Sequence, residues 1–139
     1  MKVADFGLAI TIGKPVKSVM HEVVTLYYRA PDILLGSKSY STAIDIWSIG
    51  CIFAEMVNRK TLFPGLNEED QLLKIFKGLG TPDPDTNWPK MRELPLYRAD
   101  FPIYQGEPLS KLVPTLDEQG LDLLDKMLKC NPAERISAK

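Results

Sequence analysis

The stretch from residue 42 to residue 57 constrains the fold of this chain more than any other. If this stretch is helical, apolar side chains cover nearly every face of the helix: Ile44, Ile46, Trp47, Ile49, Ile52, Phe53, Met56 and Val57. A helix that is apolar all round is buried on all sides, so we expect helix 42–57 to lie at the centre of a helical core. Thr42 and Asp45 resemble a capping box, which predicts where the helix starts.

Two further helices are indicated by apolar spacing and by the residues at their ends. Residues 67–78 form one, with Asn67 as its N-cap. Residues 117–130 form the other, and Asn131-Pro132 ends it. Their apolar sides consist of Leu72, Leu73, Ile75, Phe76 and Leu79 in the first helix, and of Leu121, Leu124 and Leu128 in the second. The pattern predicts a mainly α fold.

The rest of the chain is predicted to contain little regular structure. Residues 1–4 resemble the end of a strand, and residues 5–32 a loop with one β-branched stretch from Val23 to Tyr28. Residues 81–114 hold seven of the eleven prolines, which excludes regular helix over most of that range. The same range carries large apolar side chains, which argue against a disordered linker: Trp88, Leu94, Tyr97, Phe101 and Tyr104.

Composition excludes several classes of protein. The chain has 139 residues, of which 45% are hydrophobic and 25% charged, as in one soluble globular domain. A net charge of −1 leaves no basic surface for nucleic acid, and neither a secretory leader nor a membrane-spanning apolar run is found. With two cysteines far apart and one histidine, we expect free thiols and no zinc site.

Three motifs occur in an informative order: Asp5-Phe6-Gly7-Leu8-Ala9, then Tyr28-Arg29-Ala30-Pro31-Asp32, then Asp45-Ile46-Trp47-Ser48-Ile49-Gly50-Cys51. Further strings follow at Leu62-Phe63-Pro64-Gly65, Leu79-Gly80-Thr81-Pro82 and Arg135-Ile136-Ser137-Ala138-Lys139. Together they resemble the cyclin-dependent protein kinases, most closely the mitotic cell-division-control type, over essentially all of the chain.

The resemblance implies a fold and a domain organisation. The chain corresponds to the C-terminal lobe of a protein kinase from the D-F-G motif onward, a mainly α fragment of an incomplete α+β kinase domain. Residues 1–139 would form this partial domain, with residues 1–32 as the activation segment and residues 33–139 as the helical lobe. Residues 81–114 would be the proline-rich insert of this family.

The resemblance also implies cofactors and the residues that hold them. Asp5 would bind the Mg²⁺ ion that bridges the ATP phosphates, because a hard cation prefers carboxylate oxygen. Phe6 would pack inward and set where Asp5 points, and Gly7 would supply the backbone freedom for that change. ATP and Mg²⁺ are therefore the cofactors expected of the full-length protein. Binding of either by this chain alone is not expected.

The end of the activation segment resembles the substrate-docking stretch of kinases that modify Ser or Thr before proline. Val23 and Val24 would line an apolar pocket that accepts proline, because proline has no N–H to leave unpaired there. Arg29 would hold the backbone of this pocket, and Thr25 would touch the catalytic Asp and Lys. An ordinary β-branched strand explains the composition of this stretch but not its Arg29-Ala30-Pro31-Asp32 sequence.

Three charged residues match structural positions of the family. Arg135 would pair with Asp32, an acid one methylene shorter than the usual glutamate, and a bidentate contact can survive that change. The alternative is two unrelated surface charges. Asp45 would anchor the backbone of the catalytic loop, a role that is compatible with capping its own helix.

Other family features are absent from these 139 residues. No Gly-rich phosphate loop, strand lysine, cyclin-contacting helix or H-R-D catalytic loop is found, so Asp5 alone remains of the catalytic set and the chain by itself should be inactive. Ile10 replaces an arginine and Met20 replaces the threonine whose phosphate that arginine binds. Phosphorylation at position 20 is therefore not expected.

The resemblance implies several partners. Cyclin is expected for the full-length protein, although its main contact helix is absent here, and the substrates would be proteins with Ser/Thr-Pro sites. Glu69 stands where an apolar residue is usual and Leu66 where an acid is usual, which makes docking of the Cks-type accessory subunit doubtful. Neither nucleic acid nor membrane is expected, and the location would be the cytoplasm, the nucleus or both.

Three functional hypotheses follow. The first is a fragment of a cyclin-dependent, proline-directed Ser/Thr kinase, inactive alone. The second is a degenerate, naturally short relative that acts by binding kinase partners or substrates. The third is a free-standing helical interaction module without kinase ancestry, which the ordered motifs argue against.

Overall fold

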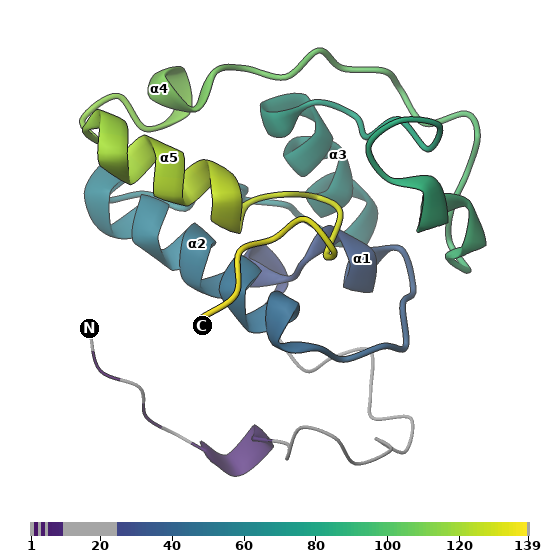
Figure 1. The fold of residues 1–139 in the computed structure, drawn as a ribbon, viewed down its shortest axis with the longest axis horizontal. Helices are drawn as coiled ribbons and strands as arrows, with labels where there is room; N and C mark the ends of the chain where they lie inside the picture. Colours follow the sequence, from purple (N-terminus) through teal and green to yellow (C-terminus); the bar gives the residue numbers. More distant parts are fainter. Residues whose placement is uncertain (1, 3, 5, 10–24, 139) are drawn as a thin grey trace.

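A computed structural model describes residues 2, 4, 6–9 and 25–138, and these residues form helices and loops with no strand among them (Figure 1). The elements are η1 (Phe6–Leu8), η2 (Leu26–Tyr28), α1 (Pro31–Leu34), α2 (Thr42–Asn58), α3 (Glu68–Leu79), η3 (Pro89–Glu93), α4 (Leu109–Leu112) and α5 (Glu118–Met127), where η is a 3₁₀ turn. The mainly α fold predicted for the chain is thus confirmed.

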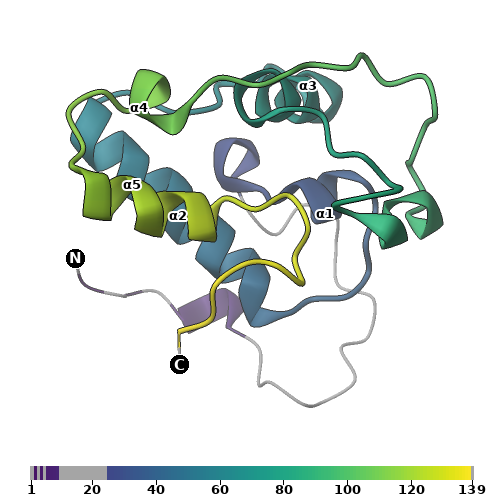
Figure 2. The ribbon, with the colours of Figure 1, turned by 45° about the horizontal axis from the view of Figure 1, so that its top comes forward.

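Helix α2 forms the centre of the core. It packs against α5 and η2, while α1 packs against α3 on the other side of the molecule (Figures 1 and 2). Trp47, Cys51 and Ala54 on α2 are buried, and the Trp47 ring stacks 6.3 Å from that of Phe63. Burial of this apolar surface is the main contribution to the stability of the lobe.

Two expectations for α2 were wrong. The helix is not buried on every side, because Ile52 is 36% and Met56 is 62% exposed. The elements that pack on α2 cover its other faces and leave these two side chains without cover from the described residues. The N-cap is Ser41 rather than Thr42, and no side chain bonds the first turn, so the predicted capping box does not form.

The predictions for α3 and α5 differ in accuracy at their ends. Asn67 caps α3 as expected, since its side chain accepts a hydrogen bond of 2.9 Å from the Asp70 N–H. Helix α5 is capped by Asp117 and ends at Met127, earlier than the predicted residue 130. The carbonyls of Lys129 and Cys130 instead accept hydrogen bonds from the Arg135 side chain, which replaces helical partners there.

The proline-rich range 81–114 is ordered by contacts with the core. Trp88, Met91 and Val113 are buried, and the Phe101 ring meets Phe76 of α3 edge-on at 5.6 Å. Within this range, regular structure is limited to the short elements η3 and α4. As predicted, the prolines exclude long helices while the aromatic side chains attach the segment to the lobe.

The predicted strand character near the N-terminus is not found. Lys2 and Ala4 lie in no strand, and Leu26–Tyr28 forms a 3₁₀ turn in which the Tyr28 N–H bonds the Thr25 carbonyl at 3.0 Å. Such local bonds replace the ladder that a strand needs. Val23 and Val24, the first residues of the expected stretch, lie outside the described residues.

Two further expectations can be compared with the structure. Both cysteines are free, as predicted, and Cys51 is buried in α2. Across the described part of the chain, the helices are too short or too polar to cross a bilayer.

Candidate functional site

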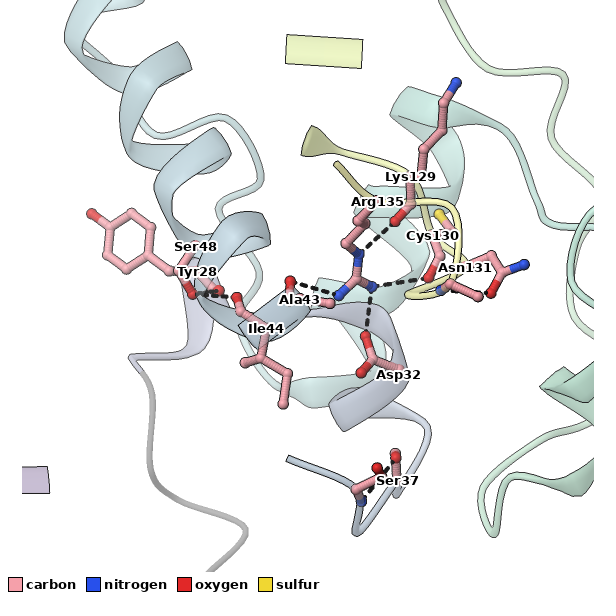
Figure 3. Close-up of polar contacts among 12 residues, drawn as sticks. Tyr28, Asp32, Ser37, Ala43, Ile44, Ser48, Lys129, Cys130, Asn131 and Arg135 are labelled. Atoms are coloured by element: carbon pink, nitrogen blue, oxygen red, sulfur yellow. Dashed lines mark hydrogen bonds and ion pairs between the residues drawn. The ribbon is translucent and has the colours of Figure 1, made fainter. Parts of the chain in front are cut away.

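The segment from Thr25 to Ala30 is held by hydrogen bonds from two helices, α2 and α3. The Tyr27 carbonyl accepts a hydrogen bond of 3.3 Å from the Gln71 side-chain amide on α3. The next carbonyl, of Tyr28, accepts one of 2.9 Å from the Ser48 hydroxyl on α2, and Figure 3 shows this contact. Consecutive peptide groups are therefore fixed by different helices, which sets both the position and the tilt of the segment.

Side chains of the same segment are held as well. The Tyr28 hydroxyl donates a hydrogen bond of 3.0 Å to a Glu55 carboxylate oxygen on α2. Burial and this carboxylate together raise the pKa of Tyr28 above its usual value. The Arg29 guanidinium, which is buried, forms an ion pair with Glu68 at the start of α3.

Gln71 connects this segment to the turn before α3. Its side chain is fully buried, and its oxygen accepts a hydrogen bond of 2.8 Å from the Gly65 N–H. A Cβ at position 65 would lie 2.5 Å from the Gln71 Cα, so glycine is needed for this close approach. The Leu62-Phe63-Pro64-Gly65 string thus has a structural purpose, which is to let the buried amide reach Tyr27.

A second buried contact closes the lobe around α2. Arg135 Nη2 lies 2.5 Å from Asp32 Oδ1, and their side chains are 0% and 4% exposed. The guanidinium also donates to backbone carbonyls at the start of α2 and in the turn after α5, and Figure 3 shows these contacts: Ala43 at 3.1 Å, Lys129 at 2.7 Å and Cys130 at 2.9 Å.

This geometry corrects one expectation and excludes another. The contact between Arg135 and Asp32 uses one guanidinium nitrogen, so it is not the bidentate pair expected from the sequence. The other nitrogens are engaged by carbonyls, which leaves no second parallel bond for the shorter acid. Two unrelated surface charges are excluded by the burial of both. The guanidinium also lies 5.2 Å above the Trp47 ring, so it ties α1, α2 and the turn after α5 together.

Asp45 lies in the first turn of α2 and is exposed. Among the described residues, none donates a hydrogen bond to its carboxylate, and no side chain caps α2, so the capping role expected for Asp45 was wrong. The helix dipole favours an acid at this position. Its role toward a catalytic loop stays a prediction.

The remaining predicted site residues are only partly described. Thr25 is exposed at the start of η2. Phe6 is 71% exposed rather than packed inward, because no described residue covers it. Gly7 follows Phe6 within η1. Asp5, Val23 and Val24, as well as Ile10 and Met20, lie outside the described residues, and their roles stay predictions.

Among the described residues, no group of three or more His, Cys, Asp or Glu side chains is placed to hold a metal ion. The expected ligand, Asp5, lies outside these residues. The side chains of Ser48, Glu55, Glu68 and Gln71 together form a platform that fixes the segment Thr25–Ala30.

A groove of about 470 Å³ lies beside the platform. Apolar side chains of Leu34, Leu72 and Phe101 line it, with Glu68 and Glu69 among its polar lining. Glu69 pairs with Arg98 across the groove at 3.1 Å. Glu68 therefore belongs to the wall of this groove and to the contact with Arg29.

Several platform residues were not found from the sequence: Ser48, Glu55, Glu68 and Gln71. Each contacts a residue at least 20 positions away, and such pairs leave no local pattern. A weak signal existed in Ser48, which is a polar residue in an otherwise apolar stretch of its helix. Buried polar groups normally find a partner, so such positions merit inspection.

The comparison with protein families covers the whole chain. A family model described as "Protein kinase domain" matches residues 1–139. The helical fold agrees with the C-terminal lobe of such a domain, and members of the family are kinase-like transferases that generally use ATP and Mg²⁺. The chain belongs to the protein kinase domain family.

Proposed function

We propose that this chain is the C-lobe part of a cyclin-dependent, proline-directed Ser/Thr protein kinase. The full-length gene product would transfer the γ-phosphoryl group of ATP to Ser or Thr followed by proline. One observation carries the proposal: the segment Thr25–Ala30 is fixed at consecutive residues, Tyr27, Tyr28 and Arg29, by contacts from α2 and α3.

The physical reason concerns selection of a residue by backbone chemistry. A pocket that rejects every residue except proline needs a backbone position at which an N–H would stay unpaired. Such a position must be held rigidly, or the backbone would move to accept the bond. The anchors at Tyr27–Arg29 follow Val23 and Val24, the residues proposed to line the pocket, after Thr25 and Leu26, and they would give that stretch a fixed end.

The cofactors and partners belong to the same proposal. ATP and Mg²⁺ would be bound by the full-length product, with Asp5 as one metal ligand and Phe6 and Gly7 beside it. Cyclin and proteins with Ser/Thr-Pro sites would be its partners in the cytoplasm, the nucleus or both. The Cks-type subunit stays doubtful, since Glu69 pairs with Arg98 across the groove beside α3.

A second candidate function is favoured by one observation on α2. Ile52 and Met56, one turn apart, are exposed on a helix whose other faces are covered. A degenerate, short relative that acts by binding kinase partners or substrates could use such an apolar face. This candidate needs no catalytic loop.

The two candidates are separated by one sequence and one assay. Sequencing the 5′ end of the transcript should reveal a Gly-rich loop and an H-R-D motif in frame with residue 1. The full-length product with cyclin should then phosphorylate a Ser-Pro peptide and prefer it to the matched Ser-Ala peptide. A transcript without these motifs, or equal kcat/KM values for the two peptides, would contradict the first proposal.

A further inference from the structure

The most exposed large apolar side chain among the described residues lies next to an apolar groove. Leu66 is 87% exposed, and it directly precedes Asn67, which lines the groove of about 470 Å³ beside α3. A single exposed leucine needs no explanation, but an exposed leucine beside an open apolar groove marks a surface that gains free energy when it is covered.

The backbone is fixed on both sides of this groove. The Leu66 N–H donates a hydrogen bond of 2.8 Å to the Asp70 carboxylate in the first turn of α3. On the opposite wall, the Leu96 N–H donates one of 3.0 Å to the Leu35 carbonyl, and the Leu96 side chain is 52% exposed. The turn that carries Leu66 therefore cannot fold inward to cover this side chain without breaking a backbone bond.

The charged side chains of the groove already have partners within one copy of the protein. Glu69 pairs with Arg98 at 3.1 Å, and Glu68 pairs with Arg29. A partner that covers the groove with an apolar side chain therefore leaves no lining charge unpaired, which would otherwise be costly. Around a two-fold axis, Glu69 and Arg98 would also meet their own counterparts, so the charges of this face are complementary to those of a second copy.

We propose that this face forms a two-fold symmetric contact between two copies of the protein, in which Leu66 of each copy enters the groove of the other. Such a contact uses the same surface on both copies, so it requires a projecting group and a receiving groove side by side on one face. Leu66 and the groove that begins at Asn67 meet this requirement. The proposal concerns association alone and does not depend on the proposed catalytic activity.

The contact is small, because each copy contributes one projecting leucine and one groove. We therefore expect a weak dimer, with a dissociation constant of roughly 10–100 μM. Sedimentation equilibrium of the full-length gene product, at concentrations from about 5 to 200 μM, measures this constant.

Leu66→Asp should raise the dissociation constant at least about tenfold, because the substitution is present twice in each dimer and removes both apolar contacts. Ile103→Asp is the matched control. Ile103 is 83% exposed and lines a different cavity, between the end of α3 and the turn after α5. The control substitution introduces the same charge and should leave the constant within about twofold of the unmodified value.

A mixture of two variants tests the geometry of the contact. Leu96→Asp places a charge on the groove wall and should also prevent dimers when it is tested alone. Leu66→Asp and Leu96→Asp together should form dimers more strongly than either variant alone, because the mixed dimer retains one intact leucine facing one intact groove. If Leu96→Asp lowers the unfolding temperature, Leu96→Ser is judged by the same criterion.

Three results would overturn the inference. A protein that stays monomeric up to the highest concentration would leave this face to a different partner. Equal weakening by Leu66→Asp and Ile103→Asp would show a general effect of added charge. A mixture no stronger than its separate variants would contradict the exchange of Leu66 between grooves. Each of these outcomes leaves the peptide assay of the proposed function unaffected, so the two proposals can fail separately.

Discussion

The buried amide of Gln71 lies 3.3 Å from the carbonyl oxygen of Tyr27, which is 44 residues earlier in the chain. Its own oxygen accepts the Gly65 N–H, so one side chain joins the platform segment to the turn before α3. The Gln71 side chain is fully buried, so water cannot replace either of these hydrogen bonds at the amide. The stability of the segment Thr25–Ala30 should therefore depend on this uncharged residue as well as on the contacts from Ser48, Glu55 and Glu68.

Replacing Gln71 by leucine should destabilise the full-length product. The Tyr27 carbonyl would lose its partner while an apolar group of similar size fills the space, at a cost of about 1–3 kcal/mol. Denaturant unfolding followed by fluorescence measures the change. Gln119→Leu, on the exposed side of α5, is the matched control and should shift stability by less than about 0.5 kcal/mol. Equal effects of the two substitutions would contradict this view of Gln71.

Arg135→Met should be among the most damaging substitutions in the lobe. It leaves the buried Asp32 carboxylate without its partner, which typically costs roughly 3–5 kcal/mol. Adding Asp32→Asn should recover part of the loss, because the remaining charge is removed. Arg92→Met breaks an exposed pair with Asp85 and should change the unfolding midpoint far less. A smaller effect of Arg135→Met than of Arg92→Met would contradict the stabilising role of the contact between Arg135 and Asp32.

The two thiols should make the protein less stable in alkali. Burial raises the pKa of Cys51 and of Cys130 from an ordinary 9.0 to about 12. Between these values the unfolded thiols release protons that the folded thiols keep, so stability is intact below pH 9.0 and falls as the pH rises toward about 12. The slope is about 1.4 kcal/mol per pH unit for each thiol.

Unfolding free energies at several pH values test this slope. The variant Cys51→Ala should lose stability less steeply than the unmodified protein above pH 9.0, whatever its stability at neutral pH. In the folded protein at pH 8, the buried Cys51 thiol should also resist alkylation by iodoacetamide. Rapid alkylation of Cys51 under those conditions would show that its burial is not maintained in solution.

A polypeptide of residues 1–139 alone should not transfer phosphate to a Ser-Pro peptide, even with cyclin added. These residues contain no catalytic base motif, no strand lysine and no phosphate loop. A radiolabelled ATP assay with the purified polypeptide measures the activity. The Asp5→Asn variant is the control for contaminating kinases, because transfer that disappears with this substitution would belong to the chain and refute the prediction.

Activation of the full-length product should not require phosphate at position 20. Met20 cannot accept phosphate and Ile10 cannot bind it, although a charge-assisted bond of this kind is worth roughly 1.5–3 kcal/mol. Met20→Thr should respond only partly to an activating kinase, and Met20→Thr with Ile10→Arg should respond more than the sum of the single changes. Additive responses would refute the coupling, and strong activation of the unmodified loop through Ser18 would refute the wider claim.

The parts of the fold that local chemistry controls could be predicted from the sequence. Asn67 and the leucine spacing after it define α3 within a few residues, because capping and apolar periodicity act over single turns. Which apolar side chains of α2 would be exposed, as Met56 is, could not be predicted in the same way. Apolarity shows that a face prefers to be covered, whereas coverage depends on which other elements reach it.

The residues of the candidate site could likewise be predicted only where a sequence motif marks them. Arg29, Asp32 and Arg135 were identified through family motifs, and the structure brings Arg135 and Asp32 together. Glu68 and Gln71 were missed because their partners, Arg29 and Tyr27, are far away in sequence. A polar side chain on the buried side of a helix marks where such a partner is needed, but the fold alone identifies it.

The separation of Arg135 from Asp32 along the chain has a consequence for synthesis. The ribosome makes Asp32 early and Arg135 103 residues later, an interval of about 5–20 seconds at ordinary translation rates. During that time the segment around Asp32 and the start of α2 lack the guanidinium that later joins them. Nascent chains of this lobe should therefore reach a protease-resistant state only after Arg135 leaves the exit tunnel.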